Sequence, residues 1–113
     1  MRVASLAETL SIADGIVRLA LDLSGSNVGY LLIDRPRDST AQHDLFDGHD
    51  NYVELKDQFF GRYDGLTEFK VIAENEIELG LSYEVPGVGA KLTVVTSAPM
   101  SKDILSYLKQ LSR

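Results

Sequence analysis

The sequence predicts an α+β fold, a mostly antiparallel meander sheet of about six or seven strands with one C-terminal helix packed on a sheet face. Three observations predict this class. Residues 76–83 alternate apolar and polar side chains, as a strand with one face in solvent does. Asp14-Gly15, a preferred pair for a two-residue hairpin turn, lies between two β-like runs. Helical spacing of apolar residues is clear only at residues 99–113.

The first part of the chain is expected to be a series of antiparallel strands. Residues 3–12 also suit a helix, but the Asp14-Gly15 turn needs a pairing partner for the strand that starts near Val17, so we assign them to a strand. Residues 24–27 form a turn. No helix is expected after it, so it is not a phosphate-binding loop. The apolar run 30–33 then predicts a central strand covered on both faces.

The second part contains a further hairpin and the helix. Its strands are predicted at residues 52–56, 66–73, 76–83 and 91–97. Glu74-Asn75 joins the two central ones, and residues 86–89 form another turn. The helix begins at Pro99 or Ser101, with Asp103 in its first turn. Its apolar stripe consists of Ile104, Leu105, Leu108 and Leu111.

Residues 57–65, DQFFGRYDG, place aromatic side chains and Arg62 around two glycines. We interpret this segment as a turn between strands whose aromatic residues fill the edge of the core. Tyr, Phe and Arg are also favoured at protein interfaces, so a protein-contact patch is the alternative. The acidic balance of the chain argues against stacking on nucleobases.

Length and composition predict one globular domain spanning residues 1–113. Without cysteine, disulfides, thiolate metal sites and cysteine nucleophiles are excluded. No signal-peptide core or membrane-spanning run is recognised, and a cytoplasmic location is expected. Asp and Glu outnumber Lys and Arg by 17 to 11, giving a net charge of −6. That charge argues against nucleic acid and anionic membranes as partners and favours a basic protein.

Residues 43–50, HDLFDGHD, contain both histidines of the chain. His43, His49 and the nearby aspartates have the ligand chemistry of zinc, manganese or iron. Their spacing matches neither a helical HExxH pair nor an EF-hand loop. We therefore expect no metal and no other cofactor, and we interpret the segment as part of a solvated acidic loop.

The same loop is the main candidate for partner binding. An apolar pair, Leu45-Phe46, surrounded by carboxylates is the pattern of an interface centre that meets a basic partner. In the alternative interpretation this pair folds back and anchors the loop. The candidate partner-binding residues are Asp44, Leu45, Phe46, Asp47, Asp50, Asp57, Arg62 and Tyr63.

No residue is assigned a catalytic role. The serines lie outside any GxSxG motif. The carboxylate pairs Glu76/Glu78 and Glu54/Asp57 have the chemistry of a general acid and base, but Glu76 and Glu78 fall on the polar face of a strand, where carboxylates are expected for solubility. We expect a non-enzymatic protein.

Residues 52–81 carry a longer pattern, in which a Tyr-Val-Glu strand start is followed by Gln, a turn with Gly and Tyr, and two amphipathic strands. The matching positions are Tyr52, Val53, Glu54, Gln58, Gly61, Tyr63 and Gly65, then Ile77, Leu79 and Leu81. This pattern is similar to that of the immunity protein 10 family, small bacterial immunity proteins of polymorphic toxin systems. The resemblance implies an α+β domain that binds and neutralises a cognate toxin without catalysis. It assigns no functional residues.

The prediction is therefore a cytoplasmic immunity protein whose acidic surface occludes a toxin with a basic face. Two alternatives stay open. One is a small metal- or carboxylate-dependent enzyme that uses residues 43–50. The other is a homo-oligomeric structural domain, in its simplest form a homodimer, that pairs exposed sheet edges.

Overall fold

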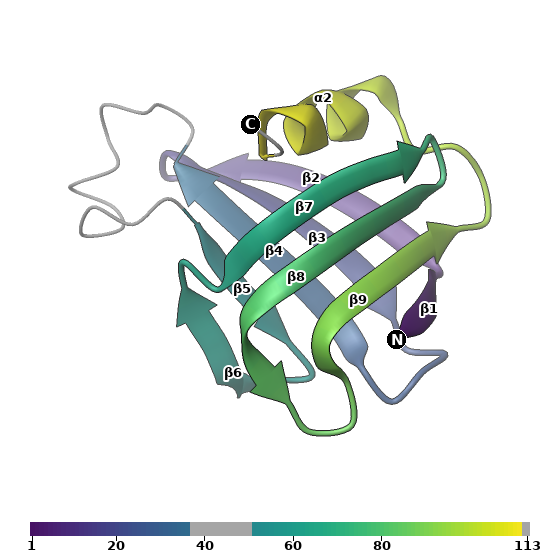
Figure 1. Cartoon of the computed structure of the whole chain (residues 1–113). Coiled ribbons are helices and arrows are strands. Elements are labelled where there is room, and N and C mark those ends of the chain that lie inside the picture. The colour runs from purple at the N-terminus through teal and green to yellow at the C-terminus, as the bar shows by residue number, and fades with distance from the viewer. Residues whose placement is uncertain (37–50, 112–113) are drawn as a thin grey trace.

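Two β-sheets pack against each other and a helix lies between them in the computed structural model, which describes residues 1–36 and 51–111, and the side chains up to residue 109 (Figure 1). The four-stranded sheet contains β1 (Arg2–Ser5), β9 (Gly89–Thr96), β8 (Glu76–Val85) and β7 (Leu66–Ala73), in that order. The five-stranded sheet contains β2 (Ala7–Ala13), β3 (Ile16–Leu23), β4 (Gly29–Pro36), β5 (Tyr52–Leu55) and β6 (Asp57–Tyr63), in that order. The helix is α2 (Lys102–Leu111).

The α+β class and the mostly antiparallel meander are confirmed. Strands that follow one another in the chain are neighbours within each sheet, and the described pairs are antiparallel except β1 with β9, which is parallel. The described residues form nine strands, more than the six or seven expected, and they divide into two sheets.

One extra strand arises because the predicted strand 3–12 divides at Leu6. Val3 and Ser5 in β1 are buried, whereas in β2 the partly buried positions are Glu8 and Leu10, so the inward alternation changes phase at this point. The Leu6 N–H donates to the carbonyl of Asp22 at 2.8 Å, which starts the pairing with β3. The chain therefore leaves one sheet and enters the other within a single residue.

A second extra strand arises because residues 57–63 form β6. The expectation of a turn is wrong for these residues, and the expectation that their aromatic side chains fill the core edge holds only for Phe60. Lys56, with a φ of 68°, reverses the chain, and the backbone then pairs with β5 at both ends of β6, with an irregularity in the register between them. Phe59 is 74% exposed, while Phe60 is half-buried and packs against the core.

The predicted hairpins are confirmed. Asp14 and Gly15 have φ values of 53° and 77°, both in the left-handed region that a type I′ turn requires. Glu74-Asn75 joins β7 to β8, and residues 86–88, within the predicted turn 86–89, join β8 to β9. The alternating apolar residues of both sheets face each other and form one core.

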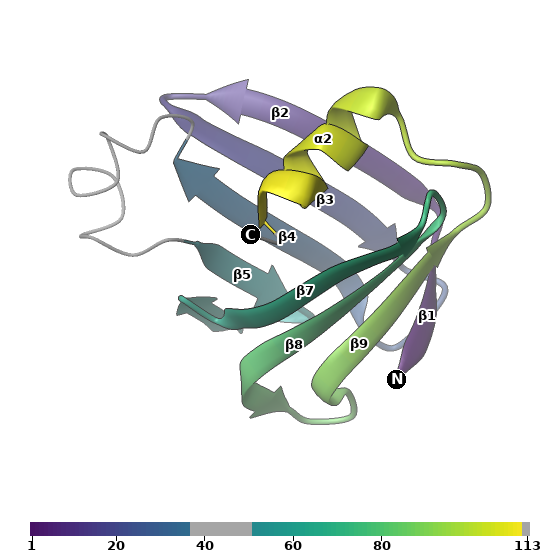
Figure 2. The same ribbon diagram turned by 45° about the horizontal axis from the view of Figure 1, so that its top comes forward.

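The helix completes the core on the side between the two sheets, where both views place it beside the end of β7 (Figures 1 and 2). The Ser101 hydroxyl accepts a hydrogen bond from the Ile104 N–H at 3.3 Å and caps the helix. Leu108 is fully buried. Tyr107 is also buried, and its hydroxyl donates to the Ile33 carbonyl of β4 at 3.0 Å. No helix within the described residues is long and apolar enough to cross a membrane.

Candidate protein-binding surface

The structure places only part of the predicted partner-binding set. Asp44, Leu45, Phe46, Asp47 and Asp50 lie outside the described residues, as do His43 and His49. Asp57, Arg62 and Tyr63 lie on β6. The structure therefore bears on the predicted surface only through these three residues.

Two of the three residues contact the backbone of their own strand. The Asp57 carboxylate accepts a hydrogen bond from the Phe59 N–H at 2.9 Å. Arg62 donates to the carbonyls of Phe59 and Gly61 at 2.9 and 2.8 Å, and its guanidinium lies 5.1 Å from the centre of the Tyr83 ring. Arg62 therefore bridges two backbone carbonyls of β6 and lies against the Tyr83 ring of β8.

Tyr63 instead belongs to a row of side chains that crosses the outer face of the five-stranded sheet. Arg18 on β3 pairs with Asp34 on β4, Asp34 with Tyr52 on β5, and Tyr52 with Tyr63 on β6. Their strand neighbours, such as Leu19, Ile33 and Val53, point into the core, so the row points away from it. The Tyr52 and Tyr63 rings meet edge to face, with centres 5.1 Å apart.

Leu32 and Glu54 are paired in the adjacent row, and Tyr30 lies on the same face of β4. The expectation that residues 30–33 are covered on both faces is therefore wrong in part, because Tyr30 and Leu32 are partly exposed. We call this outer surface the tyrosine face. It consists of Arg18, Tyr30, Leu32, Asp34, Tyr52, Glu54 and Tyr63.

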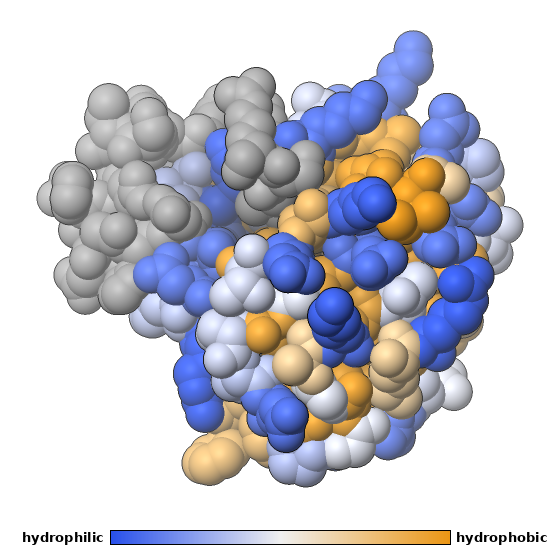
Figure 3. All heavy atoms as spheres, viewed as in Figure 1, coloured by the Kyte–Doolittle hydropathy of each residue, from blue (hydrophilic) through white to orange (hydrophobic). Residues whose placement is uncertain are grey.

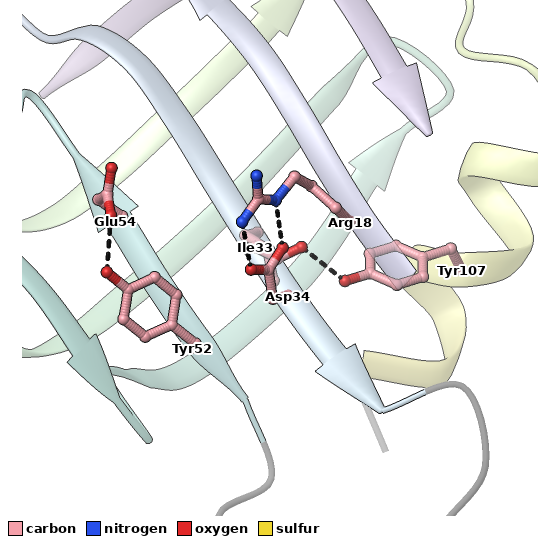
Figure 4. Close-up of polar contacts among 6 residues, drawn as sticks. All are labelled: Arg18, Ile33, Asp34, Tyr52, Glu54 and Tyr107. Atoms are coloured by element: carbon pink, nitrogen blue, oxygen red, sulfur yellow. Dashed lines mark hydrogen bonds and ion pairs between the residues drawn. The ribbon is translucent and has the colours of Figure 1, made fainter. Parts of the chain in front are cut away.

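Glu54 joins two of the tyrosines. Its carboxylate oxygens accept one hydrogen bond each from the Tyr30 and Tyr52 hydroxyls, both at 2.6 Å (Figure 4 shows the Tyr52 bond). Burial, followed by the contact with Glu54, raises the pKa of Tyr30 to about 12 and raises the pKa of Tyr52 as well. Both phenols therefore stay protonated at neutral pH and act as hydrogen-bond donors rather than as bases.

Gly61 gives Tyr52 the room to reach Glu54. A Cβ atom on Gly61 would lie 2.0 Å from the Tyr52 hydroxyl oxygen and 2.7 Å from its ring carbon Cζ. The phenol thus lies directly against the backbone of β6. A glycine covered by a cross-strand aromatic ring is a recognised way to support such a position in a sheet.

Arg18 and Asp34 form the other fixed part of the face. The Arg18 Nε and Nη2 atoms donate to the two Asp34 carboxylate oxygens at 2.7 and 2.8 Å, a bidentate arrangement (Figure 4). The Asp34 contact raises the pKa of Arg18. Asp34 is 5% exposed, so this charge is largely removed from water and is compensated by its partner.

The opposite sheet presents a different surface. The view onto β7, β8 and β9 shows hydrophilic and apolar side chains interspersed (Figure 3). A shallow hollow of about 240 Å³ lies there, lined by Glu68, Phe69, Lys70, Glu78, Leu79 and Lys91. Its acidic and basic residues balance, which is typical of a solvated sheet face.

The described residues contain no group of three or more His, Cys, Asp or Glu side chains that could hold a metal ion. Comparison of the chain with protein-family models, with curated proteins and with solved structures finds no match in any of the three. The site must therefore be interpreted from its own geometry.

Sequence reasoning missed most of the tyrosine face. Tyr30, Leu32 and Asp34 alternate along β4, but the continuous apolar run 30–33 hid the alternation. Tyr52 and Glu54 also share one face at i, i+2. That spacing was the available signal for the pair.

Proposed function

We propose that this chain is a non-enzymatic protein-binding domain and acts as a bacterial cytoplasmic immunity protein that neutralises a cognate toxin. The observation that carries the proposal is the tyrosine face, a set of partly exposed aromatic residues of which two, Tyr30 and Tyr52, are hydrogen-bonded to Glu54. Tyr and Arg are enriched at the centres of protein interfaces. Side chains that are already fixed lose less conformational entropy when a partner binds.

The charge of this face favours a basic partner. Asp22, Asp34 and Glu54 lie on the outer side of β3–β5 with one cation, Arg18, among them. The whole chain carries a net charge of −6. Association with a basic toxin surface would be accelerated by this field and weakened by salt.

The toxin as partner rests on the resemblance of residues 52–81 to immunity protein 10. Four of the matching positions, Tyr52, Glu54, Gly61 and Tyr63, build or support the tyrosine face. The pattern that suggested the family therefore coincides with the surface that the geometry favours. Occlusion of a toxin by this surface requires no catalytic group.

The test is growth protection in bacteria that express the chain together with the toxin encoded by the neighbouring gene. The wild-type chain should restore growth and co-purify with the toxin. Leu32→Arg should abolish both, because it places a cation at the centre of the face. Ile72→Arg, which replaces an exposed aliphatic residue on the other sheet, should leave both intact.

Two results would contradict the proposal. Full protection by a folded Leu32→Arg variant would exclude the tyrosine face as the binding surface. Failure of the wild-type chain to bind or protect against the neighbouring toxin would exclude the immunity function. Circular dichroism of each variant establishes that it is folded.

A further inference from the structure

We infer that Glu54, flanked by Tyr30 and Tyr52, is the binding site for one arginine side chain of the partner protein. The inference rests on the proposed function, because it names the chemistry that the tyrosine face recognises. Three features of the site carry it: the state of the carboxylate, the neighbouring rings and the charge around them.

The Glu54 carboxylate has acceptor capacity left, and within residues 1–36 and 51–109 no cation forms an ion pair with it. Each oxygen accepts one phenol hydrogen bond, and an ionised carboxylate offers about four acceptor positions in all. Two ion pairs join described residues, Arg2–Glu76 and Arg18–Asp34, and Glu54 belongs to neither. Arg18, whose charge interacts with Glu54, is already engaged by both oxygens of Asp34.

The groups beside Glu54 match an arginine better than a lysine. The Tyr30 and Tyr52 hydroxyls each contact one Glu54 oxygen, so two phenol rings lie next to the carboxylate. A planar guanidinium can contact aromatic rings while it donates to a neighbouring carboxylate. Leu32 is the direct cross-strand neighbour of Glu54 and can contact the aliphatic stem. A guanidinium is also more weakly hydrated than an ammonium, so less hydration is lost on binding.

The remaining charges add to the attraction. Asp22 is the cross-strand neighbour of Tyr30 on β3. Hydrogen bonding to the Ser24 side chain and then to the Ser24 N–H lowers the pKa of Asp22, so this group is ionised at neutral pH. Asp57 is close enough to raise the pKa of Tyr30. The Arg18–Asp34 pair is neutral overall. Glu54, Asp22 and Asp57 therefore leave the site with a net negative charge.

The test uses N-acetyl-arginine amide as the probe and the backbone amide signals of the isotope-labelled full chain as the readout. We expect saturable chemical-shift changes centred on residues 30–32 and 52–54. N-acetyl-citrulline amide, which has the same shape without the charge, should bind at least about tenfold more weakly, and N-acetyl-lysine amide should be intermediate.

Variants assign the effect to the carboxylate. Glu54→Gln should weaken arginine binding about tenfold or more, whereas Glu78→Gln, on the outer face of the other sheet, should leave it unchanged. Equal binding of arginine and citrulline probes, shifts located elsewhere, or unchanged binding by a folded Glu54→Gln variant would overturn the inference.

The outcomes separate this inference from the proposed function. Suppose that the wild-type chain does not bind N-acetyl-arginine amide, but Leu32→Arg still abolishes toxin protection. The arginine site is then refuted and the proposed function stands. If arginine binds at Glu54 but the chain neither binds nor protects against the toxin, the proposed function is the part that fails.

Discussion

At the level of single residues, the Arg18–Asp34 pair is asymmetric in a way that can be measured. The Asp34 side chain is 7% exposed and the Arg18 side chain 48%. Arg18→Met would leave a buried carboxylate without its partner, and we expect a loss of about 2–3 kcal/mol in the free energy of unfolding. Asp34→Asn would leave a guanidinium that can turn to water, at a cost of about 1 kcal/mol. Urea denaturation of both variants measures the difference.

The exposed pair Arg2–Glu76 is the control for this asymmetry. Its arginine side chain is 64% exposed, and Arg2→Met should cost less than about 1 kcal/mol. Equal losses for Arg18→Met and Asp34→Asn would mean that Asp34 is better solvated than its exposure indicates.

Tyr30 predicts a dependence of stability on alkaline pH. Its pKa is raised from 10.0 to about 12, so the folded chain keeps a proton that the unfolded chain releases. This contribution to stability is complete below the unfolded pKa of 10.0 and is lost as the pH rises through about 12. Between these values, Tyr30→Phe should make the free energy of unfolding fall less steeply than it does in the wild type. The free energy of unfolding of both proteins is measured by urea denaturation at several pH values. The same dependence on pH for Tyr30→Phe and the wild type would contradict a raised Tyr30 pKa.

The sequence predicted some residues of the candidate surface, but not the contacts between strands that position them. Tyr63 and Asp57 were predicted at the surface and are exposed there. The bond from Tyr30 to Glu54 could not be predicted, because it depends on the register between β4 and β5, and residues 37–51 separate those strands in the chain. Register is set by the packing of both faces together, which a single sequence does not reveal.

At the level of elements, the β2–β3 turn predicts a clear difference between two glycines. Gly15 has a φ of 77°, so Gly15→Ala should destabilise the chain by about 1 kcal/mol. Gly25 lies in open space and outside the positive-φ region, so Gly25→Ala should be neutral or slightly stabilising. Thermal unfolding of the two variants tests this. Equal melting temperatures would show that the type I′ turn does not determine the hairpin.

The helix predicts a second contrast. Leu108 is fully buried, and Leu108→Ala should cost about 3 kcal/mol, because it leaves a cavity between the helix and the sheets. Ser106 is exposed on the same helix, and Ser106→Ala should change stability by less than about 0.5 kcal/mol. If both variants unfolded at the same urea concentration, α2 would not be part of the cooperative core.

The elements best predicted from sequence are those with strong local signals. Asp14-Gly15 and Glu74-Asn75 indicated hairpins because the turn and both strands are contiguous. The division at Leu6 was missed because it consists only of a change in alternation. The strand at 57–63 was missed because Gly61 and Gly65 indicated a turn. The contact of the Tyr52 phenol with Gly61 explains how a glycine is accommodated within this strand.

At the level of the whole molecule, the two-sheet arrangement depends on contacts that no local pattern contains. Alternation tells which side chains point inward, but it does not tell which sheet they belong to. The parallel pairing of β1 with β9 joins the first and the last of the described strands. Because of this arrangement, the two sheets present different outer faces. The four-stranded sheet carries balanced charge, and the five-stranded sheet carries the tyrosine face.

The central claim, that the tyrosine face binds the partner, is tested most directly by hydroxyl-radical footprinting of the chain alone and in complex with the toxin. We predict that Tyr30, Leu32, Tyr52 and Tyr63 lose reactivity in the complex, while exposed Ile72 on the opposite sheet keeps it. Protection of Ile72 with unchanged reactivity at Tyr52 and Tyr63 would contradict the claim and place the partner on the four-stranded sheet.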